Sequence, residues 1–208
     1  MNRILIIGAS GRVGKKLTQF LSGNNKVTAL VRDKNKINLS NPNLEIVEGD
    51  VFDLRKLEEI SIGQNYILSA LSGRSTKPDY SVLSTGIHNI VSAMKKNKIR
   101  RLISVAGAGI LDDSEYGLRR NRPNYPETFK LVSAENWKIF EFLKTTEINW
   151  TLVCAPEMPE EKRTGIYRTT NDYLPIGGKR ISVEDVADYI IKILDDTDTF
   201  QKRIGISY

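Results

Sequence analysis

The sequence predicts an α/β fold built on a doubly wound parallel sheet with helices on both of its faces. Short, continuously apolar runs alternate with amphipathic helical patterns along the 208 residues, which is typical of buried parallel strands joined by helical crossovers. A glycine-rich turn separates the first apolar run, 4–7, from the first helical pattern, 13–21. The length predicts one domain over residues 1–208, because domains average about 150 residues.

Each expected element follows from its own local pattern. The expected strands, where apolar residues run together, are 4–7, 27–31, 44–47, 66–71, 101–105, 150–154 and 204–207. The expected helices, where apolar residues recur at three- and four-residue spacing, are 13–21, 54–60, 81–96, 130–144 and 181–194. Ser182 and Asp185 form a loose capping box at the start of the last helix. Residues 112–126 and 156–175 are expected to be irregular, and 156–180 to form a small substrate-side segment.

Composition excludes several classes of protein. The single Cys and single His leave no disulfide framework and no His/Cys zinc cluster, so we expect no metal site. Cys154 is interpreted as a buried, inert thiol and His88 as a structural residue. The net charge of +6 is spread along the chain, so no nucleic acid partner is expected. No apolar run reaches the ~18 residues of a membrane span, and 4–7 is too short for a signal peptide. We therefore expect a cytoplasmic protein without a membrane partner, either a monomer or a homodimer.

The turn after residue 7 has the composition of a phosphate-binding loop. Its residues are Gly8, Ala9, Ser10, Gly11, Arg12, Val13 and Gly14. The spacing Gly-x-x-Gly-x-x-Gly is one residue looser than the Gly-x-Gly-x-x-Gly of Rossmann-type sheets. Gly8 lets the chain turn off the strand, Gly11 lets the backbone approach a pyrophosphate, and Gly14 lets the helix pack closely. The helix N-terminus offers N–H groups to the anion. A glycine turn required only for packing is the alternative.

Two arginines indicate which dinucleotide binds. NAD enzymes place an acidic residue after the second strand to hold the ribose hydroxyls, whereas here Arg32 follows that strand and Arg12 lies inside the glycine turn. Guanidinium groups can fork a 2′-phosphate, and NAD has none. Asp33 could still bind a ribose from the next position, and Arg32 could be a solvated loop charge. We predict NADP as the cofactor, with NAD less favoured.

The ends of the next strands supply further candidate residues. After the third strand, Asp50 can accept from the adenine amino group while the Val51 amide donates; a simple Gly-Asp turn is the alternative. The fourth strand ends in Ala70, Leu71, Ser72 and Gly73, small enough as a group for a nicotinamide ribose to approach the backbone. After the fifth strand, Ala106 and the small residues that follow it leave room beside the nicotinamide.

These motifs together resemble the atypical short-chain dehydrogenase/reductases. The likeness rests on 8–14, 31–33, 48–51 and 101–109, and it continues through 150–153 and 182–187. The chain is similar in particular to the NAD(P)H-binding group that includes NmrA-like proteins and biliverdin reductase B or flavin reductase-type enzymes. Over essentially the whole chain, the resemblance implies a Rossmann-type fold and an NAD(P) cofactor; it is less specific about the activity.

The sequence departs from this family where carbonyl reductases carry their acid. Those relatives have a Ser after the fifth strand and a Tyr-x-x-x-Lys on the following helix, where the Lys lowers the pKa of the Tyr. Counted along this chain, the Ser position falls on Ala106 or Gly107, and the Tyr and Lys positions fall near Val132 and Asn136. No catalytic residue is therefore assigned, and tyrosine-assisted carbonyl reduction is disfavoured.

The nearest local pair does not restore that acid. Tyr125 and Lys130 are five residues apart across a Pro-containing loop, so we expect them not to share a helical face. Hydride transfer to a flavin or quinone does not need the acid, since water can supply the proton. We predict an NADPH-dependent oxidoreductase acting on such a small-molecule acceptor. A non-catalytic NAD(P)-sensing regulator of NmrA-like type is the alternative. A sugar-nucleotide epimerase or dehydratase is weaker, because those relatives need the Tyr and resemble longer chains.

Three side chains are candidates for contacting the acceptor. The segments 112–126 and 156–175 are expected to form the substrate walls. Tyr116, Met158 and Tyr167 within them offer surfaces on which a planar acceptor could stack. Ordinary loop packing explains each of the three equally well.

Overall fold

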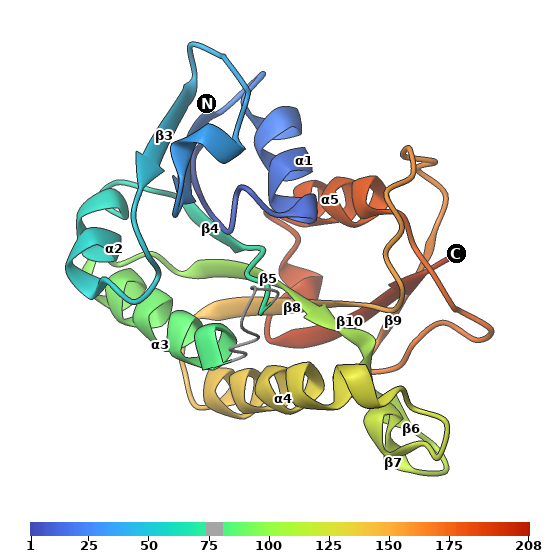
Figure 1. Ribbon diagram of the computed structural model, residues 1–208. Coiled ribbons are helices and arrows are strands. Elements are labelled where there is room, and N and C mark those ends of the chain that lie inside the picture. The colour runs from blue at the N-terminus through green and yellow to red at the C-terminus, as the bar shows by residue number, and fades with distance from the viewer. Residues whose placement is uncertain (74–80) are drawn as a thin grey trace.

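A large, mainly parallel sheet is the framework on which the rest of the chain is arranged. The computed structural model describes residues 1–73 and 81–208. Eight strands pair in the order β3-β2-β1-β4-β5-β8-β10-β9, in which all pairs are parallel except β10–β9 (Figure 1). These strands are β1 (Arg3–Ile7), β2 (Lys26–Val31), β3 (Leu44–Glu48), β4 (Tyr66–Ser69), β5 (Arg101–Gly107), β8 (Asn149–Ala155), β9 (Arg168–Asn171) and β10 (Lys202–Ser207).

The helices begin and end close to where the periodicity predicts. They are α1 (Arg12–Leu21), α2 (Leu54–Ile60), α3 (Ser81–Lys96), α4 (Lys130–Lys144) and α5 (Val183–Lys192). The N-cap half of the predicted capping box is confirmed, because the Ser182 side chain accepts from the Asp185 N–H at 2.9 Å. The reciprocal bond is not formed, since the Ser182 N–H donates to the Tyr208 hydroxyl. Within the two described ranges, no helix is long and apolar enough to cross a membrane.

The strand order reverses between β1 and β4. From β1 the chain moves outward through β2 to β3, and from β4 it moves the other way through β5 and β8. The connections after β1 and β4 therefore diverge to opposite faces of the sheet, which opens the usual ligand position of doubly wound folds. The predicted doubly wound parallel sheet is confirmed, and the carboxyl ends of β1 and β4 are the place to examine for function.

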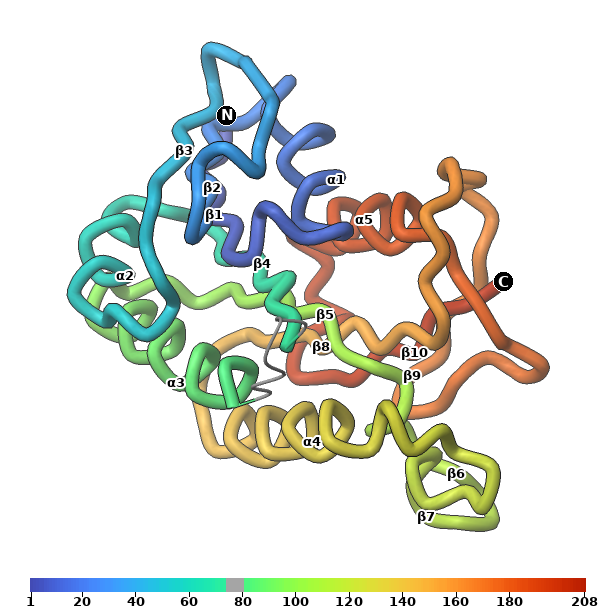
Figure 2. Tube along the Cα trace, in the orientation of Figure 1, coloured from blue at the N-terminus to red at the C-terminus, as the bar shows by residue number. Residues whose placement is uncertain are grey.

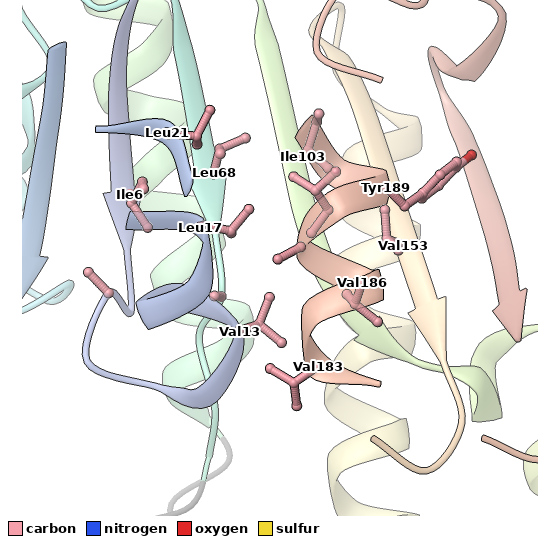
Figure 3. Close-up of a cluster of buried hydrophobic side chains, with 14 of the residues drawn as sticks. Ile6, Val13, Leu17, Leu21, Leu68, Ile103, Val153, Val183, Val186 and Tyr189 are labelled. Carbon is pink, nitrogen blue, oxygen red and sulfur yellow. The ribbon is translucent and has the colours of Figure 1, made fainter. Parts of the chain in front are cut away.

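Both faces of the sheet are covered by helices. Helices α1 and α5 lie on one face and α2, α3 and α4 on the other (Figure 1). Alternation along β1 sends Ile6 toward α1 and Ile7 toward α3, and both are at most 1% exposed. Figure 3 shows Leu17 of α1 and Val186 of α5 within one apolar layer. Burial of each such side chain contributes about 1.5–3 kcal/mol, so this layer holds both helices against the sheet.

The segments expected to be irregular contain short strands. Within 156–175 the chain forms β9 at the sheet edge. Its four residues are all exposed, so the sequence has no apolar run that would predict this strand. Within 112–126 it forms a hairpin of β6 (Asp112–Asp113) and β7 (Gly117–Leu118), which projects from one corner of the molecule (Figure 1). Strand β4 ends at Ser69, two residues before the predicted end at 71.

The segment after β8 is attached to α5 by a buried carboxylate. This segment runs beside α5 before it joins the sheet as β9 (Figure 2). The Asp185 side chain, fully buried, accepts hydrogen bonds from the Thr164 and Gly165 N–H groups at 3.1 and 2.8 Å and from the Tyr208 hydroxyl at 2.7 Å. Burial alone would raise the pKa of Asp185, but these hydrogen bonds outweigh it and hold the pKa below its usual range.

The substitution Asp185→Asn should therefore lower the free energy of unfolding at pH 7 by about 2–3 kcal/mol, because buried donors lose their acceptor. The pKa of the folded state is depressed, so this stabilisation is present above the unfolded pKa of about 3.9 and is lost as the pH falls through the folded value. Urea unfolding of both proteins at pH 7 and at pH 3 measures the difference. Glu160→Gln, an exposed change in the same segment, is the control. An equal effect of the two substitutions at pH 7 contradicts the anchoring role.

Candidate functional site

The glycine turn brings β1, α1 and the end of β4 into backbone contact. Gly8 has φ +79°, and a Cβ there would lie 2.6 Å from the Ala70 carbonyl oxygen. A Cβ on Gly14 would lie 2.2 Å from the Gly8 carbonyl oxygen, and one on Gly11 would lie 3.2 Å from the same atom. Real Cβ atoms do not approach other atoms within 3.0 Å, so Gly8 and Gly14 are required for the fold itself. Gly11 is the least constrained of the three.

The N-terminus of α1 is arranged to receive an anion. Gly11 precedes the helix and provides no capping side chain, and the first turn contains no acidic residue. The first N–H groups of the helix therefore depend on water or a ligand, and the positive end of the helix dipole is not neutralised. Ala9 and Val13 are buried beneath the turn, whereas Ser10 is partly exposed beside it.

The two arginines of the sequence prediction have different surroundings. An Nη1 atom of Arg12 donates to the Met158 carbonyl, which ties the glycine turn to the segment after β8. The Arg32 side chain is exposed at the end of β2 and makes no hydrogen bond or ion pair with any described residue. Arg32 is thus the arginine whose guanidinium is available to a phosphate. Recognition of a 2′-phosphate by either residue remains a prediction.

The acidic residues after β2 and β3 form turns. Asp33 caps a short 3₁₀ helix by accepting from the Asn35 N–H at 3.0 Å. Asp50 accepts from the Phe52 N–H at 3.0 Å, and the buried Val51 accepts from the Asn89 side chain through its carbonyl at 3.0 Å. Asp50 and Val51, the residues predicted to bind adenine, therefore lie at the carboxyl edge of the sheet. Their role in a turn does not conflict with the predicted contact with adenine.

The end of β4 supplies a small, closely packed edge. The Ala70 N–H donates to the Ile7 carbonyl at 2.8 Å, so Ala70 continues the pairing with β1 beyond the end of the strand. Ala70 and Gly73 are buried, Leu71 is half-buried and Ser72 is exposed. Together with the close approach of Gly8 to Ala70 and Leu71, this places two of the four predicted cofactor residues of this strand end beside the glycine turn.

The end of β5 carries small residues under the first turns of α4. Ala106 is buried, and a Cβ on Gly107 would lie 3.6 Å from the Asn136 Nδ2 atom. The Asn136 side chain is 4% exposed, and its amide makes no hydrogen bond with any residue in 1–73 or 81–208.

Tyr125 and Lys130 do not form the Tyr–Lys pair of carbonyl reductases. Tyr125 lies outside α4, which begins at Lys130, and the Lys130 Nζ donates instead to Glu127. A Cβ on Gly109 would lie 2.3 Å from the Tyr125 hydroxyl and 2.5 Å from the Ser133 Oγ, so both side chains pack over that glycine. Burial raises the pKa of Tyr125, which is opposite to the lowering that a catalytic acid requires.

The predicted acceptor-contacting residues lie in three different places. The Met158 backbone meets Arg12 at the glycine turn, as described above. The Tyr167 hydroxyl donates to Asp188 at 2.8 Å and its ring packs edge-on against Tyr189 of α5, so both ends of the side chain are used in packing. Tyr116 lies on the β6–β7 hairpin beside a cavity of about 410 Å³. Acceptor contact by these residues stays a prediction.

The interpretation of Cys154 and His88 as structural agrees with their surroundings. Cys154 is fully buried in β8, and burial raises the pKa of its thiol, so the reactive thiolate is disfavoured. His88 stacks on the Phe142 ring with centroids 3.6 Å apart, which joins α3 to α4.

Asn136 is a buried polar residue of α4 to which the sequence patterns assigned no role. The count along the chain reached this position only as the place of an absent Lys. The missed signal is the apolar stripe of α4, in which Val132, Ile139 and Leu143 recur at helical spacing and Asn136 falls on the same stripe. A polar residue on a buried stripe indicates either a partner or a ligand.

Comparison with known proteins identifies the family. A family model described as NAD(P)H-binding matches residues 8–197. The chain belongs to this NAD(P)H-binding family. The uncharacterised protein YwnB of Bacillus subtilis (strain 168) is 29% identical over 202 residues, which cover 94% of this chain and 92% of that protein.

Solved structures of similar proteins carry different names. A Bacteroides thetaiotaomicron structure provisionally named an epimerase has a TM-score of 0.86 and 29% identity, covering 100% of this chain and 97% of the other. A Streptococcus pneumoniae TIGR4 structure provisionally named an NADH-flavin reductase has a TM-score of 0.85 and 24% identity, covering 100% and 99%. An epimerase name therefore occurs on a chain of this length, so length no longer counts against that class.

The residues at the turn fit the dinucleotide that the family name implies. The Gly8–Gly14 backbone forms a cradle that side chains would fill, and an uncapped helix N-terminus adjoins it. Gly11 and the α1 N-terminus would hold the diphosphate, and the edge formed by Ala70 and Ala106 would border the nicotinamide end.

The substitution Gly11→Ala should weaken NADP binding roughly 10-fold or more while the protein still folds. Its Cβ would lie 3.2 Å from the Gly8 carbonyl oxygen, which a small shift relieves, and at an ordinary 3.7 Å from the Ala70 carbonyl oxygen. The added methyl group would occupy part of the cradle proposed for the diphosphate. Isothermal titration calorimetry gives the Kd, and thermal unfolding checks the fold. Gly23→Ala, where nothing lies within 4 Å of the added Cβ, is the matched control. Equal NADP affinity in the two variants would exclude the turn as the binding loop.

Proposed function

We propose that this protein is an NADPH-dependent oxidoreductase that transfers a hydride to a small planar acceptor such as a flavin or a quinone. The observation that carries the proposal is the composition of the β5 end. Small residues, Ala106 and Gly107, border the position expected for the nicotinamide. Counted without gaps along the chain, the position of the Lys of carbonyl reductases falls near Asn136, which cannot supply a proton. Such a site can bring a donor and an acceptor together without supplying an acid.

The chemistry requires little of the protein beyond positioning. NADPH supplies two electrons and a hydrogen as hydride, and water supplies the proton that the reduced acceptor takes up. The glycine turn and α1 would fix one end of the dinucleotide, and the backbone edges of β4 and β5 would fix the other. Alignment of two bound reactants contributes several kcal/mol to lowering the barrier. The Arg12–Met158 contact keeps the segment after β8 beside the glycine turn.

The proposal predicts that the purified protein oxidises NADPH when FMN or menadione is added. The decrease in absorbance at 340 nm measures turnover, with biliverdin and a UDP-sugar assayed in parallel as competing substrate classes. Gly11→Ala should lose most of the activity and Gly23→Ala should keep it. If a preparation that binds NADP oxidises NADPH with none of these acceptors, the oxidoreductase proposal is refuted.

Preference for NADPH over NADH is supported by the unpaired guanidinium of Arg32. Charge-assisted hydrogen bonds contribute about 1.5–3 kcal/mol, so Arg32→Ala should raise the Kd of NADP roughly 10- to 100-fold. The Kd of NAD should change less than about 2-fold, since NAD has no 2′-phosphate. Calorimetric titration with both nucleotides tests this. Lys36→Ala removes an exposed charge from the adjoining 3₁₀ helix and serves as the control. Equal losses for NADP and NAD would contradict 2′-phosphate recognition.

A dinucleotide-sensing regulator is the second candidate function. It is favoured by the absence of the Tyr and Lys that carbonyl reductases use as their acid, since the counted positions fall near Val132 and Asn136. This candidate requires tight NADP binding without turnover of any acceptor. It also requires a protein partner whose affinity for this chain differs between the oxidised and the reduced dinucleotide.

A further inference from the structure

Another cavity lies at the opposite edge of the sheet from the glycine turn. It has a volume of about 290 Å³ and is formed where β1, β2 and β3 begin and where the chain approaches β4. Ligands of doubly wound folds bind at the carboxyl edge of the sheet, so this cavity at the amino edge is separate from the expected dinucleotide site. Its polar lining includes Arg3, Lys26, Thr28, Glu45 and Gln64.

Backbone hydrogen bonds hold the walls of this cavity in place. The Val27 N–H donates to the Asn43 carbonyl at 2.8 Å, and the Asn65 N–H donates to the Arg3 carbonyl at 2.8 Å. The Arg3 N–H donates in turn to the Asn65 side chain at 2.9 Å. These bonds join the residues that precede β3 and β4 to the starts of β2 and β1. The cavity is therefore part of the sheet framework and is formed before any ligand binds.

The wall of the cavity contains an amide with an unused acceptor. The Gln64 side chain is 8% exposed, and its Nε2 atom donates at 3.1 Å both to the Thr28 Oγ1 atom and to the Ile60 carbonyl. Its Oε1 atom is buried and accepts from no residue within 1–73 or 81–208. Both N–H groups are in use, so the orientation of the amide is fixed and its oxygen is left for a donor that a ligand brings.

Three charged side chains of the cavity have no protein partner. Arg3 on β1 and Lys26 on β2 are register partners. Glu45 on β3 is the register partner of Thr28, which lies two residues after Lys26. The side chains of these residues therefore share one face of the sheet, on strands about 4.8 Å apart. All three charged residues are exposed, and none forms a side-chain hydrogen bond or ion pair with the described part of the chain.

We propose that this cavity binds a small dicarboxylic amino acid, such as glutamate or aspartate. Its two carboxylates pair with the cations of Arg3 and Lys26, and its ammonium donates to Glu45 and to the Gln64 Oε1 atom. Each charge of the ligand then meets an opposite charge, and the buried acceptor gains a donor. A simple anion such as sulfate would leave Glu45 facing a negative charge and Gln64 without a donor. The volume lies near the lower limit of roughly 300–1,000 Å³ for ligand cavities, which suits a molecule of this size.

Three related probes test which charges are recognised. L-glutamate has two carboxylates and an ammonium, glutarate lacks the ammonium, and γ-aminobutyrate lacks one carboxylate. Isothermal titration calorimetry should give a Kd for L-glutamate roughly 10-fold or more below those for the other two, because each missing charge leaves a group of the cavity unpaired. Saturating NADP should change the Kd for L-glutamate by less than about 2-fold, since the dinucleotide is expected at the other edge of the sheet.

Two exposed residues of the cavity can be changed without disturbing the core. Glu45→Gln should raise the Kd for L-glutamate roughly 10-fold and should not raise that for glutarate, because glutarate has no ammonium. Lys26→Gln should raise both Kd values roughly 10-fold, because each ligand loses a partner for a carboxylate. Lys95→Gln, which removes an exposed charge from α3, is the matched control and should behave as wild type. Thermal unfolding checks that each variant folds.

The results distinguish a built site from a patch of surface charge. Similar affinities for L-glutamate, glutarate and sulfate would overturn the proposal, as would an equal response of L-glutamate and glutarate to Glu45→Gln. Displacement of L-glutamate by NADP, or the lack of saturable L-glutamate binding, would overturn it as well. The proposed oxidoreductase function is independent of these outcomes, because NADPH oxidation and L-glutamate binding are measured separately on the same preparation.

Discussion

The structure depends on one close approach of backbone to backbone, where the glycine turn leaves β1. There is no space for a side chain between Gly14 and the Gly8 carbonyl or between Gly8 and the Ala70 carbonyl. This contact places the uncapped N-terminus of α1 beside the end of β4, at the point where the strand order reverses. The same two glycines thus close the fold and position the proposed anion site, so stability and the proposed ligand binding impose one requirement on the sequence.

A second layer of contacts positions the segment that borders this site. Three carboxylates of α5 hold residues 163–167: Glu184 accepts from the Arg163 N–H, Asp185 from Thr164 and Gly165, and Asp188 from Tyr167. The Arg12–Met158 contact and the 2.7 Å ion pair between Lys16 and Glu184 connect the same region to α1. A movement of α1 on ligand binding would therefore be transmitted to the segment after β8.

The sequence was sufficient for those features that are encoded locally. Helices 54–60, 81–96 and 130–144 were predicted to the residue, because the periodicity of apolar positions and the breaks around them are local properties. The glycine turn was also predicted from spacing alone. Strand β9 was not predicted, since an exposed edge strand contains only polar residues here. The contact of Arg12 with Met158 joins residues 146 positions apart, and local patterns carry no information on such a pair. The burial of Asn136 on α4 was not predicted either, because it depends on the packing of α4 against the end of β5.

The titratable groups near α4 explain why recognition, and not proton transfer, is the contribution that this helix can make. Burial raises the pKa of Tyr125, so its phenol is a weaker acid than in water. Burial would raise the pKa of Glu135 as well, but hydrogen bonds from Lys138 and Ser84 outweigh it and keep the carboxyl ionised near neutral pH. General acids work best when their pKa is near the working pH, and these two are shifted away from it in opposite directions. The helix is therefore suited to an acceptor that needs orientation from the protein and takes its proton from water.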